Sequence, residues 1–475
     1  MGIFRKITAI FVIAVIALAA VPANAAVELK YAEDQTMTLM YSTEATSLCA
    51  FGASASANDW QAVSNCVEGL MTVDKYGKLL PGLAESYEVS DDAMTYTFHI
   101  REGLKWVNVK GEPMGDLTAH DFVAVARFTL EPERASPNAL YFENVIQGAK
   151  EFLAGETDDF DIVAFVALDD YTLQISLVGP LPYFLSYCGS YQPAYAPLLE
   201  ELGDNYGIDN ETMYYVGAYI MTVFEPQYRR VYEKNPDYYN ADEVFIEKVT
   251  MLYNAEYYTI GPELFLRGEI DYAQIDTAIL DEWKKNDATK NIVIPSLPDT
   301  TYMYYYGFNY DPNFDEQYEP ENWRLAVNNE NFRQSLYWAI NREKALLCQD
   351  PYNPQMQFTN SITPIGCAFV DGVDFTQIGP MAEITARPNQ QFDGEKALAY
   401  KEKAVEELTA AGATFPIKVL MPYNPVLSSW ENEVQVVKQQ ITELLGEDYR
   451  ACPFGVSSVA KHPTFLRPCS MYLPY

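Results

Sequence analysis

The sequence predicts a mixed α/β protein built from more than one domain. Its 475 residues are too many for one hydrophobic core, so two or three domains are expected. Hydrophobic residues make up 49% of the chain and charged residues 21%, which is the composition of a globular protein. Segments with alternating apolar residues are interleaved with segments that carry them at helical spacing, as in an α/β fold.

The N-terminus has the features of a cleavable export signal. Arg5 and Lys6 precede an uncharged apolar run that ends at Pro22, and residues 23–25 are the small Ala-Asn-Ala. The run is too short for a membrane span, and no other stretch is long and apolar enough for one. We expect residues 1–25 to be removed, which leaves a soluble protein in the periplasm or outside the cell. No Cys lies at the cleavage point, so no lipid anchor is expected.

Strands are indicated by alternation of apolar and polar residues. In residues 95–100, Tyr96, Phe98 and Ile100 alternate with polar side chains, and residues 172–177 repeat the pattern. A third alternation, in which Tyr302 and Tyr304 share one face, predicts a later strand. The remaining predicted strands are 27–41, 228–232, 244–253 and 415–421.

Helices are indicated by capping residues and by apolar residues at helical spacing. Thr118, with Asp121 three residues later, is typical of a capped helix start. A long helix over 393–411 is closed by Gly412, which is a favourable residue just after a helix. The other predicted helices are 332–347 and the amphipathic 430–445.

Composition argues against several functional classes. The formal charge of −34 repels phosphate groups, so nucleic acid and anionic membranes are poor partners. No motif of a serine hydrolase or zinc protease is present, and the paired carboxylates at 91–92 and 169–170 lie in predicted turns. No metal or other cofactor is expected, because the three histidines are not spaced like a ligand pair. These histidines are His99, His120 and His462.

Seven cysteines in an exported chain can form disulfides, and an odd number leaves at least one over. Cys49 and Cys66 are close in sequence, and so are Cys348 and Cys367, so both pairs are candidate bridges. Spacing alone does not determine the connectivity, which stays open at this point.

A series of short motifs resembles the extracellular solute-binding proteins of family 5, and their oligopeptide-binding branch in particular. Each motif alone is weak, but a dozen occur in the family's order across residues 40–420. The clearest are Glu-Gly-Leu at 68–70, Pro-Gly-Leu-Ala-Glu-Ser-Tyr at 81–87, Thr-Phe-His-Ile-Arg-Glu-Gly-Leu-Lys-Trp at 97–106, Leu-Thr-Ala-His-Asp-Phe at 117–122, Lys-Asn-Pro-Asp-Tyr-Tyr at 234–239, Arg-Gly-Glu-Ile-Asp at 267–271 and Ala-Ile-Asn-Arg-Glu at 339–343.

This resemblance implies a two-lobed fold of the periplasmic-binding-protein kind, with a hinge and a small extra domain on the first lobe. The ligand of such a protein is enclosed as the lobes close. The expected boundaries are a signal peptide at 1–25, lobe I at 26–67 and 186–290, the small domain at 68–185, an incomplete lobe II at 291–450 and an aberrant tail at 451–475.

The function implied by the resemblance is that of the substrate-binding subunit of an ABC-type importer. Such a protein is a monomer that captures peptides outside the cytoplasmic membrane and delivers them to membrane permease subunits. Two alternatives stay open, a secreted hydrolase and a peptide sensor without transport. Nickel- and haem-binding relatives share much of the fold, so the ligand is also left open.

Candidate ligand contacts follow from the same resemblance. Ala55-Ser56-Ala57 matches a stretch of lobe I beside the bound peptide, although a surface loop would have the same composition. Asn138 stands where the oligopeptide-binding branch has a Tyr, and the nearby Tyr141 is either a substitute or a core residue. Tyr302 and Tyr304 are expected to face the cleft, with sheet packing as the alternative.

The last 25 residues differ from the rest of the chain. Residues 451–475 contain no Asp or Glu, include four Pro and lack an amphipathic period. The family resemblance fades after Arg450, and the later motif whose Asp pairs with the peptide amino group is not found. We expect a frameshift or truncation here, with a natural flexible tail as the alternative.

Overall fold

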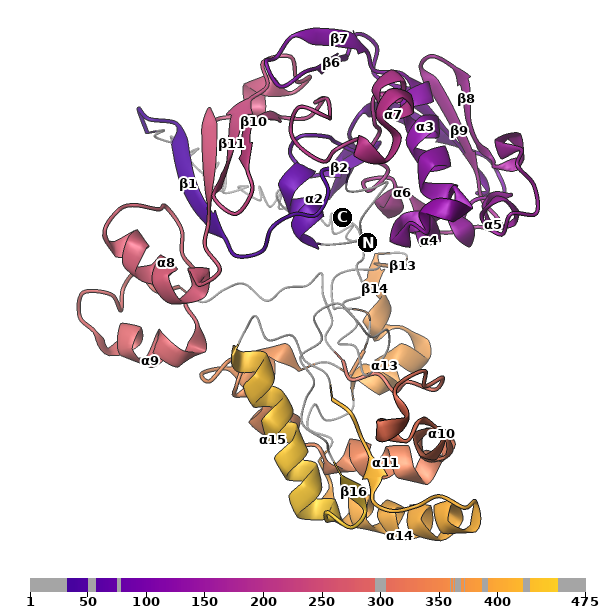
Figure 1. The fold of residues 1–475 in the computed structure, drawn as a ribbon, viewed down its shortest axis with the longest axis vertical. Helices are drawn as coiled ribbons and strands as arrows, with labels where there is room; N and C mark the ends of the chain where they lie inside the picture. The colour runs from indigo at the N-terminus through magenta and orange to yellow at the C-terminus, as the bar shows by residue number, and fades with distance from the viewer. Residues whose placement is uncertain are drawn as a thin grey trace, which may run out of the picture.

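The computed structural model forms two bodies, which we call the first body (residues 32–294) and the second body (residues 305–451) (Figure 1). The first body is drawn in indigo to pink and the second in orange to yellow. The structure describes residues 32–451 except for 50–56, 75–77, 295–304, 359, 362, 364–368, 371, 387–391 and 422–427.

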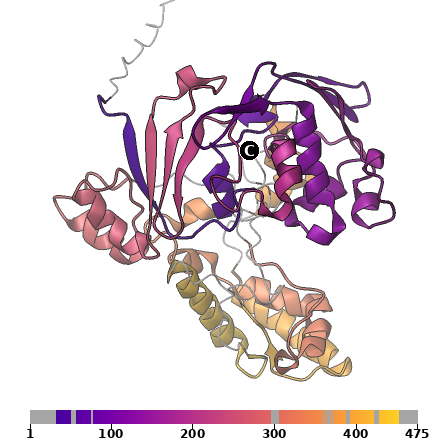
Figure 2. The same ribbon diagram turned by 45° about the horizontal axis from the view of Figure 1, so that its top comes forward.

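A four-stranded sheet forms one side of the first body (Figure 2). Its order is β1 (Thr36–Tyr41), β12 (Lys248–Tyr253), β11 (Arg229–Lys234) and β10 (Tyr219–Glu225). β1 runs parallel to β12, and the other neighbours are antiparallel. The strand predicted at 228–232 is therefore confirmed, and the predictions at 27–41 and 244–253 each contain a strand that is shorter than expected.

A second, antiparallel four-stranded sheet lies on the other side of this body. Its order is β4 (Ala84–Val89), β5 (Thr95–Ile100), β9 (Thr172–Ser176) and β8 (Phe165–Asp169). Buried and partly exposed residues alternate along β5 and β9, as their sequences predict. Both predicted strands are confirmed.

Helix α3 (Ala119–Leu130) contacts β8 and begins as predicted. The backbone N–H of Thr118 donates to Asp121 Oδ2 at 2.9 Å, which is half of a capping box. Asp121 also accepts from Trp106 Nε1 at 3.1 Å and from the N–H of Ala196 at 2.8 Å. The capping residue therefore also ties the helix start to two other segments.

The first body has one continuous core, which runs from Leu48 to Tyr232 and joins both sheets. The remaining elements of this body are α2 (Ala57–Val63), β2 (Met71–Val73), β3 (Leu79–Pro81), β6 (Lys105–Val107), β7 (Pro113–Asp116), α4 (Leu140–Glu143), α5 (Ala149–Leu153), α6 (Phe184–Tyr187) and α7 (Ala196–Leu202). The boundaries expected for the small domain stay a prediction.

Helices α8 (Tyr257–Leu266) and α9 (Thr277–Lys285) form a separate unit at the β1 edge of the sheet. Met40, Tyr257 and Ile270 form a small core between this unit and β1. The N–H of Thr38 donates to Asp271 Oδ2 at 2.7 Å, and the N–H of Asp271 donates to Thr38 O at 2.9 Å. These contacts join the unit to the first body.

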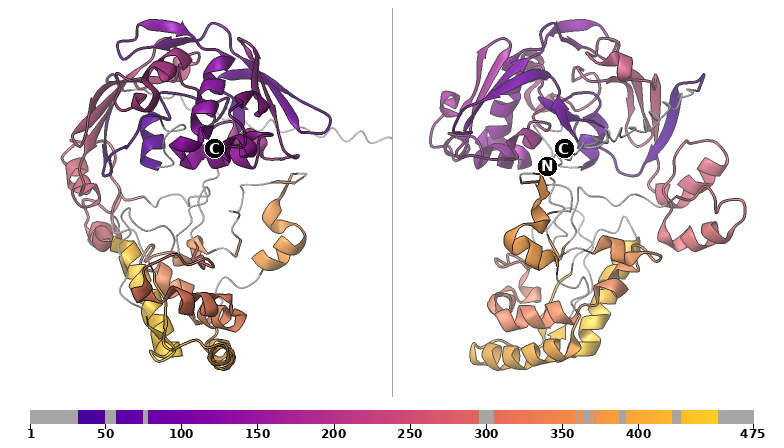
Figure 3. Two further views of the ribbon diagram at one scale, coloured as in Figure 1. Left: turned by 45° about the vertical axis from the view of Figure 1, so that its right-hand side comes forward. Right: turned by 180° about the vertical axis from the view of Figure 1, so that it is seen from behind.

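The second body is mainly helical (Figure 3). Its core is formed by residues of α10, α11, α14 and α15 together with β15, and Tyr449 lies in it. The elements are α10 (Pro320–Asn328), α11 (Glu330–Ala339), α12 (Arg342–Leu346), β13 (Phe369–Val370), β14 (Val373–Asp374), α13 (Gly379–Thr385), α14 (Gly394–Ala410), β15 (Ile417–Lys418), α15 (Ser428–Leu445) and β16 (Arg450–Ala451).

Two predicted helices of the second body are confirmed, and one prediction is corrected. α14 and α15 match the predictions at 393–411 and 430–445, and Gly412 follows α14 at φ 85°. The single helix expected at 332–347 is two helices, because the Asn341 side chain accepts from the N–H of Lys344 and starts α12. The strand expected at 415–421 is reduced to β15.

The disulfide expectations are wrong in this structure. Cys66 is a thiol whose Sγ lies 4.0 Å from Ala62 O, so it is not bonded to Cys49. Cys348 is also a thiol, and its expected partner Cys367 lies outside the described residues. Burial raises the pKa of Cys66 to about 12, which keeps this thiol protonated and unreactive.

Several expectations concern the two ends of the chain. The signal peptide at 1–25 and the tail residues 452–475 lie outside the described residues. Within the part of the chain that the structure describes, no helix is long and apolar enough to cross a membrane.

Candidate functional site

The residues expected to contact a ligand are only partly described by the structure. Ala55, Ser56, Tyr302 and Tyr304 lie outside the described residues, and Ala57 is the first residue of α2. What the structure does describe is the framework on either side of these segments.

Asn138 and Tyr141 are described in full. Asn138 is fully buried, and its backbone N–H donates to Ser136 Oγ at 3.3 Å. Tyr141 lies in α4 with its ring half-buried, edge-on to Tyr187 at 5.8 Å between centroids. Tyr187 in turn packs against the half-exposed Tyr183 at 5.7 Å. Tyr141 therefore belongs to a tyrosine cluster at the surface of the first body, whereas Asn138 lies beneath that surface.

Asp59 fixes both ends of the segment that contains the small-residue loop. It lies in the first turn of α2, its side chain is buried, and Oδ2 accepts from Thr46 Oγ1 at 2.8 Å. Asp59 Oδ1 accepts from the N–H of Thr46 at 2.5 Å and from that of Ser47 at 3.4 Å. A buried carboxylate that accepts several backbone donors holds the chain before the loop close to the helix that follows it.

A buried ion pair supports the same segment from the sheet. The Arg230 guanidinium donates to Glu44 Oε1 through Nε at 3.2 Å and through Nη2, and it lies 4.2 Å from the ring centroid of Tyr41. Glu44 Oε2 accepts from the N–H of Gln227 at 2.7 Å. Burial opposes ionisation of Glu44, but these donors outweigh it and lower its pKa. Burial also raises the pKa of Tyr41 to about 12.

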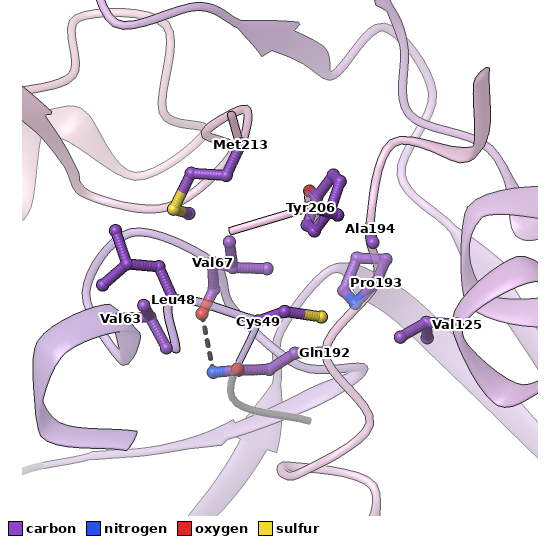
Figure 4. Close-up of a pocket in the computed structure, with 10 residues that line it drawn as sticks. All are labelled: Leu48, Cys49, Val63, Val67, Val125, Gln192, Pro193, Ala194, Tyr206 and Met213. Atoms are coloured by element: carbon purple, nitrogen blue, oxygen red, sulfur yellow. Dashed lines mark hydrogen bonds between the residues drawn. The ribbon is translucent and has the colours of Figure 1, made fainter. Parts of the chain in front are cut away.

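A small cavity lies next to this segment, and it is too small to hold a ligand (Figure 4). Its volume is about 20 Å³, which is room for about one water molecule. Gln192 Nε2 donates to Val67 O at 2.8 Å along its wall, and this bond is drawn in Figure 4. The lining is otherwise mostly apolar. The lining residues are Leu48, Cys49, Val63, Val67, Val125, Gln192, Pro193, Ala194, Tyr206 and Met213.

In the second body, Glu433 of α15 joins two segments that are far apart in sequence. It accepts from the Tyr306 hydroxyl at 2.8 Å and from Gln349 Nε2 at 2.8 Å. Tyr306 lies two residues after Tyr304, which lies two residues after Tyr302, and these two tyrosines are the expected cleft residues. This contact therefore fixes the chain just after it enters the second body.

Sequence reasoning missed the residues that build this framework. Arg230 lies in a predicted strand, but nothing in the surrounding sequence indicates its partner. That partner is Glu44, which lies 186 residues away. Glu433 looks like an ordinary polar residue of an amphipathic helix. Asp59 follows the small-residue loop closely, and a carboxylate in a first helical turn was a usable signal.

Comparisons with known proteins agree with this architecture. A family model described as bacterial extracellular solute-binding proteins, family 5 Middle, matches residues 78–448. The oligopeptide-binding protein AliB of Streptococcus pneumoniae is 28% identical over 441 residues, which cover 87% of this chain and 66% of AliB. The dipeptide-binding protein DppE of Bacillus subtilis is 30% identical over 355 residues, which cover 73% of this chain and 58% of DppE.

The fold also matches solved structures. The structure of Listeria monocytogenes OppA bound to peptide superimposes with a TM-score of 0.67 at 20% identity, over 89% of this chain and 77% of that chain. The two-lobed α/β fold implied by the motifs is thereby confirmed, while the incompleteness of the second lobe stays a prediction. The chain spans just under two thirds of the length of AliB, at 66%. The family match covers most of the chain, and the chain belongs to the bacterial extracellular solute-binding proteins of family 5.

Proposed function

We propose that this chain is the substrate-binding subunit of an ABC-type importer and captures peptides outside the cytoplasmic membrane. Membership of family 5 is the observation that carries the proposal. AliB and DppE, which resemble the chain over most of its length, are named as oligopeptide- and dipeptide-binding proteins. The two-body architecture supports it, because a ligand between two lobes is released and captured by their relative motion.

We further propose that the protein binds peptides without hydrolysing them, uses no cofactor, works as a monomer and delivers its ligand to permease subunits. The signal-like segment at 1–25 supports export, and an intact mass that begins near Ala26 would agree with it. An acylated terminus or a retained Met1 on secreted protein would contradict this part of the proposal.

Ligand capture is tested by thermal unfolding with a mixture of peptides of two to eight residues. A peptide that binds only the folded state raises Tm, and mass spectrometry of the mixture should find every peptide intact. Free amino acids, Ni²⁺ and haem are the controls, because a larger shift with one of these would point to another ligand class. Steady cleavage that a single carboxylate substitution abolishes would show a hydrolase instead.

The ligand contacts stay a proposal that substitution can test. We propose that Ala55, Ser56 and Ala57 line one side of the peptide and Tyr302 and Tyr304 the other. Tyr302→Ala and Tyr304→Ala should weaken peptide binding about tenfold or more while Tm without ligand changes little. Unchanged affinity in both variants would place these tyrosines in sheet packing.

Asn138 and Tyr141 complete the proposed set of contacts. Tyr141 has a half-buried ring at the surface of the first body, whereas the Asn138 side chain is fully buried. Tyr141→Ala should therefore weaken peptide binding more than Asn138→Ala does. Asn138→Ala should mainly lower Tm, because it removes a buried polar side chain.

A further inference from the structure

The helix α9 of the first body contacts the turn after α12 of the second body. Tyr352 is at the centre of this contact, because its hydroxyl donates to Asp281 Oδ1 and Lys284 Nζ lies 3.4 Å from its ring centroid. Thr277 Oγ1 donates to Cys348 O at 3.4 Å at the other end of the same surface. We call these interactions the α9–Tyr352 contact.

Both sides of the contact are rigidly held. On the first body, Asp276 caps α9 by accepting from the N–H of Ala278 at 2.8 Å, and Trp283 of the same helix is buried. On the second body, Asp350 Oδ1 accepts from the N–H of Tyr352 at 3.0 Å and from that of Asn353 at 2.8 Å. A side chain that joins two fixed segments transmits their orientation instead of moving freely.

The contact is also linked to Tyr306, which is among the first described residues of the second body. Glu433 joins Tyr306 to Gln349, which lies three residues before Tyr352, with both hydrogen bonds at 2.8 Å. A series of contacts therefore runs from α9 through the turn to Glu433 of α15 and on to Tyr306.

We propose that Tyr352 is a positioning residue that restricts the orientation of the two bodies relative to each other. It links Asp281 and Lys284 of α9 to the turn that Glu433 holds on α15. The consequence of this restriction for ligand capture rests on the proposed function. When fewer relative orientations of the two bodies are accessible, closing on a ligand costs less entropy. The side chains are largely exposed, so the effect on affinity is modest.

The experiment measures the distance between the bodies directly. A keto amino acid replaces Glu200 of α7 and Glu406 of α14, both exposed, and carries an oxime-linked spin label, which avoids the native cysteines. Pulsed electron paramagnetic resonance then gives the distribution of distances without ligand. Tyr352→Ala should broaden this distribution, and Tyr352→Phe should broaden it less, because the ring that Lys284 contacts is retained.

Tyr310→Ala is the matched control. Tyr310 is 50% exposed and Tyr352 is 47% exposed, but the Arg333 guanidinium over the Tyr310 ring belongs to the same body. The control should leave the distance distribution unchanged. An unchanged distribution in Tyr352→Ala, or equal broadening in Tyr310→Ala, would overturn the proposal. Should Tyr352→Ala fail to fold, the exposed α9 variant D281A/K284A removes the same contact from the other side and must broaden the distribution.

Peptide binding is measured separately on the same variants. Tyr352→Ala should weaken it by about two- to fivefold, the size expected of an exposed contact. A broadened distribution with unchanged affinity would overturn the role in ligand capture. Absence of peptide binding by the unmodified protein would count against the proposed function alone, because the distance measurement uses no peptide.

Discussion

Arg230 and Glu44 form an ion pair in which Arg230 is only 2% exposed, although the two residues lie 186 positions apart. The pair connects β11 to the segment that leads into the small-residue loop. A buried charge that loses its partner is costly. We therefore expect substitutions in this pair to lower the free energy of unfolding more than other substitutions in the same framework.

Arg230→Met should destabilise the protein by about 3–5 kcal/mol, because it leaves the Glu44 carboxylate without its charge partner. Thermal or urea unfolding followed by circular dichroism measures the loss. The neighbouring Arg229 is 41% exposed at its side chain and pairs with Glu225 at 2.7 Å. Arg229→Met should change stability by no more than about 1 kcal/mol. Equal losses in the two variants would mean that burial of the pair has no energetic weight.

The contribution of Glu44 should depend on pH in a defined direction. Its pKa lies below the ordinary value of 4.5, so the folded state favours the ionised carboxylate. Stability from this group is present above pH 4.5 and is lost as the pH falls through the lower folded-state pKa. Glu44→Gln should therefore be less stable than the unmodified protein at pH 7, and the difference in Tm should shrink towards pH 3. A difference that stays constant over this range would argue against ionisation as the cause.

Glu68 should show the opposite dependence. Burial raises its pKa above the ordinary 4.5, although hydroxyl groups including that of Tyr238, 3.2 Å from Oε1, oppose the shift. The fold favours the protonated carboxyl, so ionisation costs stability as the pH rises from 4.5 through the raised folded-state value. Glu68→Gln resembles the protonated form, and its Tm should rise relative to the unmodified protein between pH 4 and pH 7. A relative Tm that falls over that range would contradict the raised pKa.

The start of α14 should depend on its capping residue. Asp393 accepts from the N–H of Lys396 at 3.0 Å, so Asp393→Ala should cost about 1 kcal/mol. Glu402 is exposed on the same helix, and Glu402→Ala should change stability by less than about 0.5 kcal/mol. Urea unfolding of both variants provides the comparison, and a similar effect of the two substitutions would exclude a capping role.

The buried thiol of Cys66 should resist labelling. Its burial is complete and its pKa is raised to about 12, so little thiolate forms at neutral pH. A maleimide should label the partly exposed Cys348 well before Cys66, and both should react in denaturant. Mass spectrometry of tryptic peptides identifies the labelled residues. A Cys49–Cys66 disulfide in the exported protein would appear as a linked peptide pair and would contradict the thiol assignment.

Local structure was largely predictable because its causes lie within a few residues along the chain. The capped start of α3 at Thr118, the cap of α14 at Asp393 and the glycine at 412 each act on their nearest backbone groups. The alternation in β5 and β9 likewise reflects one buried face. The break at Asn341 was missed, although its side chain starts α12 by the same short-range mechanism.

The family and the two-lobed fold followed from ordered motifs that are readable in the sequence itself, and so did the interleaving of strands and helices. The tertiary structure alone decided the long-range partners: Glu44 for Arg230, Tyr306 and Gln349 for Glu433, and Asp281 for Tyr352. It also decided that Cys66 is a thiol and that Asn138 is buried. The physical reason is that burial and charge pairing depend on which surfaces meet when distant segments pack. Spacing along the chain carries no information about that packing.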